Sequence, residues 1–182
     1  MFSLDVRAGV KLVLAEPGHA EAVADLIARN FNRLAAYEPW GDVAPDAATM
    51  RARIQERGEA FAQGRGVRTY IRVGNRFVGA CGLRLDPPAG SAEVGFWLDL
   101  DFEGQGLASD CVRALVGLAF TEYDLRRVTL KTHTENVRAR KLAERLGFVY
   151  EGQARSAISF GADRYGDEVT YAVLVDEWVP AS

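Results

Sequence analysis

The chain has 182 residues, a formal net charge of −3, two cysteines and two histidines. This length suits a single domain over residues 1–182 with a substantial core, and the apolar fraction of 48% is that of a soluble globular protein, which excludes disordered and collagen-like chains. The small acidic charge and the lack of a basic patch argue against nucleic-acid binding.

No stretch approaches the roughly 18 apolar residues of a membrane span, and residues 1–10 lack the apolar run of a signal peptide. We therefore expect a cytoplasmic protein without membrane contact. Cys81 and Cys111 lie in apolar segments without C-x-x-C spacing, so they are predicted to be reduced core residues, and no metal site is expected.

The first third of the chain predicts a strand at 11–14 and two helices. The first helix begins at Pro17 and ends near Asn32, because apolar residues recur at i, i+3, i+4 and i+7. The second helix places Met50, Ile54 and Phe61 inward.

The loop between these helices is a candidate acceptor-binding segment. Its candidate contacts are Tyr37, Glu38 and Trp40. The alternative is that these side chains only pack beneath the loop.

Two β-rich runs, 68–73 and 76–83, flank Gly74-Asn75, which predicts a hairpin because both residues tolerate positive φ. A further strand at 92–98 leads into Glu103-Gly104-Gln105-Gly106-Leu107-Ala108-Ser109, where a helical pattern opens. Glycine permits close backbone approach, and the first amides of a helix can bind an anion. This segment therefore indicates a phosphate cradle, the alternative being an ordinary turn from strand to helix.

The rest of the chain predicts a helix to about Phe120, a strand at 127–132, a helix at 136–146 ended by Gly147, and strands near 148–155 and 169–175. The order β-α-α-β-β-β-α-β-α-β-β gives one mixed α/β (α+β) domain of about seven strands and four helices.

Two segments together carry a family resemblance. The run 103–109 resembles the coenzyme A loop Q/R-x-x-G-x-G/A of the GNAT superfamily of N-acyltransferases, and 136–148 resembles its N-x-x-[SA] to E-[KR]-L-G-F segment. The stretch 30–40, with its Pro39-Trp40, and the C-terminal segment 171–178 are similar to the RimJ/RimL branch, whose known members acetylate N-termini of ribosomal proteins.

The resemblance implies acetyl-CoA as co-substrate, with its pantetheine arm in a V-shaped splay between the fourth and fifth strands, 92–98 and 127–132. The residues implied to bind coenzyme A are Leu98, Leu100, Gln105, Gly106, Leu107, Ala108, Ser109, Asn136 and Lys141. Lys141 stands where the branch usually has arginine, and Asn136 could instead be only a helix N-cap.

Two departures from the family pattern bear on the chemistry. Glu103 replaces glutamine or arginine and is expected to point to solvent, away from the phosphates. Ala139 replaces a serine proposed to protonate the leaving thiolate, so no general acid is visible. The thiolate, with a pKa near 8.5 if it resembles cysteine, could depart without one.

The expected chemistry is direct attack of an amine on the thioester, with a backbone N–H near Leu98 stabilising the oxyanion. Glu93 is the first candidate base and His133 the second. Their alternatives are a surface carboxylate and a histidine that bonds its own loop. The amine is a protein N-terminus or a small molecule, and a homodimer is left open.

Two other functions are compatible with the sequence. Without a general acid the chain could be a non-catalytic acyl-CoA sensor, or it could be an acyltransferase with another donor such as succinyl-CoA.

Overall fold

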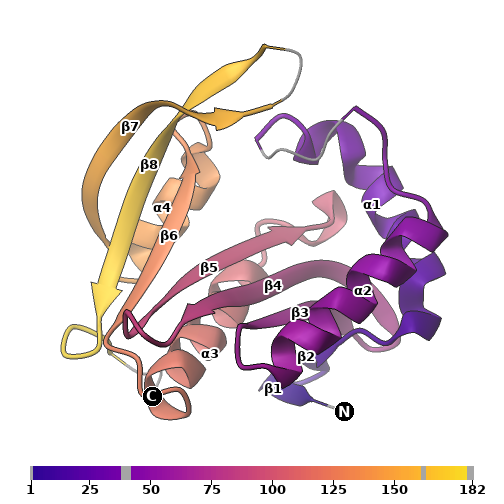
Figure 1. Ribbon diagram of the computed structural model, residues 1–182, viewed down its shortest axis with the longest axis horizontal. Coiled ribbons are helices and arrows are strands. Elements are labelled where there is room, and N and C mark those ends of the chain that lie inside the picture. Colours follow the sequence, from indigo (N-terminus) through magenta and orange to yellow (C-terminus); the bar gives the residue numbers. More distant parts are fainter. Residues whose placement is uncertain (1, 38–41, 161–162, 180–182) are drawn as a thin grey trace.

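The computed structural model describes residues 2–37, 42–160 and 163–179. Within these ranges one mixed sheet forms the centre of the molecule (Figure 1). Its strands are β1 (Ser3–Arg7), β2 (Val10–Leu14), β3 (Gly66–Val73), β4 (Arg76–Asp86), β5 (Ser91–Leu98), β6 (Arg127–His133), β7 (Val149–Ser159) and β8 (Tyr165–Leu174). The spatial order is β1-β2-β3-β4-β5-β6-β8-β7, and only the β5–β6 pair is parallel.

Helices cover both faces of this sheet. They are α1 (Ala20–Leu34), α2 (Ala47–Ala62), α3 (Leu107–Thr121) and α4 (Val137–Arg145). Helices α1 and α2 pack on one face, where Met50 and Ile54 meet Tyr70, and α3 and α4 pack on the other, around Val94 and Leu130 (Figure 1). In the described part of the chain, no helix is long and apolar enough to cross a membrane.

The sheet splits between β5 and β6, as the predicted V-shaped splay requires. These strands pair only from Ser91 opposite Arg127 to Val94 opposite Leu130. Beyond that point β5 continues to Leu98 paired with β4, and β6 continues to His133 paired with β8. The two half-sheets therefore diverge and leave the facing edges of β5 and β6 without a strand partner between them (Figure 1).

The sheet contains one strand more than the sequence predicts. Strand β1 was missed because it is short and only Leu4 and Val6 turn partly inward from it. A two-residue turn with Gly9 at φ 75° joins β1 to β2, a signal that could have identified it. The predicted hairpin at Gly74-Asn75 is confirmed, since β3 and β4 pair on either side of it.

The cysteines occupy the core, as predicted. Cys81 and Cys111 are both buried and free. Burial raises the pKa of the Cys111 thiol to about 12. Both cysteines therefore pack as small apolar side chains.

Candidate active site

A cleft of about 1230 Å³ passes through the sheet at the splay. The end of β5 from Val94 to Leu98 forms one wall, and Leu130 to Thr132 of β6 form the other. Helices from both faces complete it: Leu34 and its neighbour Tyr37 from the α1 side, and residues of α3 and α4 from the opposite side. Side chains from both faces of the sheet therefore line this one cleft.

The turn before α3 has the geometry of an anion cradle. Gly104 and Gly106 have φ values of 74° and 76°, and a Cβ added at Gly106 would meet nothing within 4 Å, so the space beside this backbone is open. The first helical hydrogen bond runs from Asp110 N to Gly106 O at 3.0 Å, which leaves the amides of 107–109 without an acceptor in the helix. These amides suit a phosphate.

The predicted cradle residues differ in their relation to the cleft. Gly106, Leu107, Ala108 and Ser109 line it. Gln105 is not among the described lining residues, because its side chain turns back and donates to Asp101 O at 3.1 Å.

Helix α4 adds positive charge beside the cradle. Arg138, Lys141 and Arg145 all line the cleft, and their spacing of i, i+3 and i+7 places them on one side of the helix. Arg145 also donates to Ser109 Oγ at 2.6 Å, which joins α4 to the first turn of α3. The family resemblance predicts only Lys141 of these three, although their spacing in the sequence also indicates Arg138 and Arg145.

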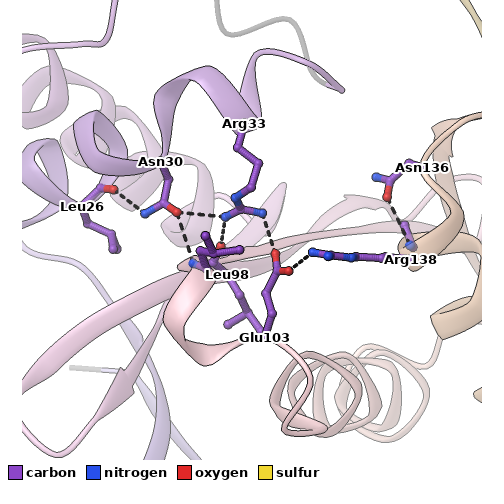
Figure 2. A network of polar contacts seen from close by, with 9 residues as sticks. Leu26, Asn30, Arg33, Leu98, Glu103, Asn136 and Arg138 are labelled. Atoms are coloured by element: carbon purple, nitrogen blue, oxygen red, sulfur yellow. Dashed lines mark hydrogen bonds and ion pairs between the residues drawn. The ribbon is translucent and has the colours of Figure 1, made fainter.

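Glu103 joins opposite walls of the cleft (Figure 2). Its Oε1 accepts from Arg33 of α1 at 2.6 Å, and its Oε2 pairs with Arg138 of α4. The expectation that Glu103 points to solvent is therefore wrong: its side chain is only 21% exposed. Two guanidinium groups offset the carboxylate charge that would otherwise repel a phosphate.

Arg33 and Asn30 also hold the end of β5. Arg33 donates to Leu98 O and, at 3.0 Å, to Asn30 Oδ1 (Figure 2). The same Asn30 Oδ1 accepts from Leu100 N at 3.3 Å. Two backbone atoms of the predicted coenzyme A residues, Leu98 O and Leu100 N, thus already have partners from α1. The neighbouring stretch of β5 begins at Gly95, just beyond the last residue that pairs with β6, Val94.

Asn136 is a helix cap and also a cleft residue. Its Oδ1 accepts from Ala139 N at 3.3 Å, and its Nδ2 donates to Thr132 Oγ1 at 3.0 Å. Asn136, Thr132 and Ala139 all line the cleft. Both interpretations of Asn136 from the sequence are therefore geometrically compatible.

The two candidate bases lie near the cleft, but neither is among its described lining residues. Glu93 Oε2 is 2.7 Å from Arg84 Nη2 and 3.8 Å from Lys131 Nζ, on the face that α1 and α2 cover. His133 Nδ1 accepts from Glu135 N at 3.2 Å, so a backbone amide of its own loop occupies that lone pair.

The predicted acceptor residues are only partly placed. The Tyr37 ring lines the cleft, and its centroid is 6.5 Å from that of His133. Glu38 and Trp40 lie outside the described residues. For metals, no group of three or more His, Cys, Asp or Glu side chains in the described ranges could hold an ion.

An anion cradle, a row of cations and a slot between diverging strands together define a site for a donor with a phosphate end and an extended arm. An acceptor can approach from the other face, so the arrangement is that of a group-transfer enzyme with a coenzyme A donor.

Comparison with known proteins agrees with this geometry. Residues 10–149 match the acetyltransferase (GNAT) domain, and the chain belongs to this family. It is 31% identical to the putative ribosomal N-acetyltransferase YdaF of Bacillus subtilis, over 98% of each chain. It is 26% identical to the ribosomal-protein-serine acetyltransferase of Escherichia coli, over 96% of this chain and 97% of the relative.

Solved structures show the same fold. A probable acetyltransferase superposes with a TM-score of 0.90 at 32% identity, covering 98% of this chain and 99% of that one. RimL, a ribosomal L7/L12 alpha-N-protein acetyltransferase solved with coenzyme A, also gives 0.90, at 25% identity over 97% and 99% of the two chains. The protein is an acetyl-CoA-dependent N-acetyltransferase, and a non-catalytic sensor is not favoured.

Proposed function

We propose that the acceptor is the N-terminal α-amine of a protein, of the ribosomal class on which the relatives named above act. The observation that supports this most directly is the passage of the cleft through the sheet. An extended chain terminus can enter from the α1 side while coenzyme A occupies the α3 and α4 side. Such an acceptor would place the enzyme in the cytoplasm, where ribosomes are.

The transfer follows from this arrangement. The phosphates sit at the amides of 107–109, the arm extends into the splay, and the amine reaches the thioester from the opposite face. The nitrogen–carbon bond forms and the carbon–sulfur bond breaks, which leaves the electron pair on sulfur. A backbone N–H of β5 near Leu98 stabilises the oxyanion in this proposal.

Glu93 remains our first candidate for the base. It lies on the face from which the acceptor enters, and Lys131, which does line the cleft, is 3.8 Å from its carboxylate. Because Glu93 does not itself line the cleft, we propose that a water molecule relays the proton from the amine. His133 is the weaker candidate, since Glu135 N already occupies its Nδ1.

The test is release of coenzyme A with a panel of acceptors. The panel contains peptides that represent ribosomal-protein N-termini, the same peptides with blocked N-termini, a polyamine and an amino sugar, each with acetyl-CoA and succinyl-CoA. We expect kcat/KM for a free N-terminal peptide to exceed that of its blocked form and of the small amines by at least about tenfold. Equal turnover of blocked peptides, or preference for a small amine, would refute the N-terminal acceptor.

A further inference from the structure

Negative charge develops on the sulfur as it leaves, and Ala139 has no hydroxyl that could stabilise this charge. Three described side chains that line the cleft carry a hydroxyl: Tyr37, Ser109 and Thr132. Ser109 Oγ is at the phosphate end and accepts from Arg145. Tyr37 is on the acceptor side, so Thr132 is the one that lies within the splay between these ends.

Thr132 is fixed in this position by its strand and by α4. It follows Leu130, the last residue of β6 paired with β5, by two positions, so its side chain shares the face of buried Leu130. Asn136 Nδ2 donates to its Oγ1 at 3.0 Å, and Asn136 is itself held by Ala139 N. The hydroxyl is therefore positioned by a side chain that the helix N-terminus already orients.

The bond from Asn136 also determines what Thr132 can do. A hydroxyl has one hydrogen to donate, and here an amide hydrogen occupies a lone pair of its oxygen. Within the described residues, Thr132 Oγ1 accepts this bond from Asn136 and donates none. The hydrogen is thus available to an acceptor in the cleft.

A donor held at the cradle would extend its sulfur toward this hydroxyl. The cradle at 104–109 lies just beyond the C-terminal end of β5, at the open mouth of the splay. From there the arm extends toward the vertex at Val94 and Leu130. The thioester at its far end would then lie between the arms of the splay, where Thr132 forms part of the wall.

We propose that Thr132 donates a hydrogen bond to the sulfur of the departing thiolate. As the amine nitrogen bonds to the carbonyl carbon, the carbon–sulfur bond breaks and sulfur keeps the electron pair. Thr132 stabilises this negative charge and keeps its own proton. The proton lost by the attacking nitrogen passes to the base or to water, and coenzyme A leaves as the thiolate or takes a proton from solvent.

The test measures the single-turnover rate of acetyl transfer in three single variants, with the amine that the wild type acetylates best. Thr132→Val removes only the hydroxyl and should slow transfer about 10- to 100-fold, the effect of losing a hydrogen bond to a charged group. Thr132→Ser keeps the hydroxyl and should stay within about threefold of wild type. Thr129→Val is the matched control, because the Thr129 hydroxyl bonds to Ala92 O at 3.2 Å, where β5 and β6 are paired.

Two further measurements distinguish donation to sulfur from a merely structural role. Acetyl-CoA affinity should change less than threefold in Thr132→Val, since the bond forms only as charge develops. Adding Ala139→Ser to Thr132→Val should recover much of the rate, because it offers a hydroxyl from the first turn of α4. Unchanged transfer in folded Thr132→Val, an equal loss in Thr129→Val, or a loss explained wholly by weaker acetyl-CoA binding would each overturn the proposal.

Discussion

Substitution of Asn136 should separate its capping role from its role in the cleft. Asn136→Ala removes the N-cap of α4 and the donor to Thr132 together. In the wild type, Ala139 N is 3.3 Å from Asn136 Oδ1. Asn136→Asp keeps an oxygen for this amide, but it presents a carboxylate instead of an NH₂ group to the Thr132 hydroxyl. That carboxylate would accept the hydroxyl hydrogen and turn it away from the cleft.

The expected magnitude follows from the length of the capping bond. Loss of an N-cap costs about 0.5–2 kcal/mol. Because 3.3 Å is long for an N–H to oxygen bond, we expect the lower half of this range for Asn136→Ala. For a chain of this size, a loss of about 0.5–1.2 kcal/mol lowers Tm by about 1–5 °C. Asn136→Asp should leave Tm within about 1 °C of wild type, since aspartate is as good a cap.

Thermal unfolding and single-turnover transfer, measured on the same preparations, check both parts. Asn136→Asp should combine wild-type Tm with transfer slowed about 10-fold or more, as for loss of the Thr132 hydrogen bond. A fall in Tm as large as that of Asn136→Ala would refute the capping argument. Wild-type transfer in a stable Asn136→Asp protein would refute the role given to its amide.

Three other changes test separate parts of the site and core. Gly106→Val places a β-branched side chain at a φ of 76°, beside the open cradle. Calorimetry should show acetyl-CoA binding weakened at least about tenfold while the protein stays folded, and unchanged affinity would refute the role of the cradle in binding. Glu93→Gln should lower kcat about 10²-fold near neutral pH, less at higher pH where the amine arrives neutral, and wild-type kcat across that range would exclude Glu93 as base. Burial raises the pKa of the Cys111 thiol to about 12. The neutral thiol is therefore favoured in the folded state, and its full contribution to the free energy of unfolding is present below about pH 8.5 and is lost as the pH rises. The unfolding free energy of wild type relative to Cys111→Ala should therefore fall by about 1.4 kcal/mol per pH unit between about pH 9 and 11, and a constant difference would contradict the burial argument.

Local sequence patterns predicted the elements whose periodicity is strong. The inward positions of α1 follow the helical period, and Ala20, Val23 and Ile27 are buried as expected. Its end was placed near Asn32 but is at Leu34, since apolar periodicity does not fix a terminus. Strand β1, with its few apolar residues, has too weak a pattern to stand out from a loop.

The site was predictable where one segment builds it and not where distant segments meet. The cradle could be predicted because two glycines precede one helix within a few residues. The bonds of Glu103 could not, since Arg33 lies 70 residues before it and Arg138 35 residues after it. Nothing in the neighbourhood of Glu103 in the sequence specifies either partner. The pairing depends on the fold bringing α1 and α4 to opposite sides of the same cleft.

The passage of the cleft through the sheet has a consequence for the order of events in catalysis. In a pocket with one mouth, the substrate bound second blocks the exit of the first, and product release follows a fixed sequence. In the proposed arrangement, coenzyme A and the acceptor enter from opposite faces. Neither one then obstructs the other, so access alone imposes no compulsory order of binding or release, and any such order must come from conformational coupling between the two halves of the sheet.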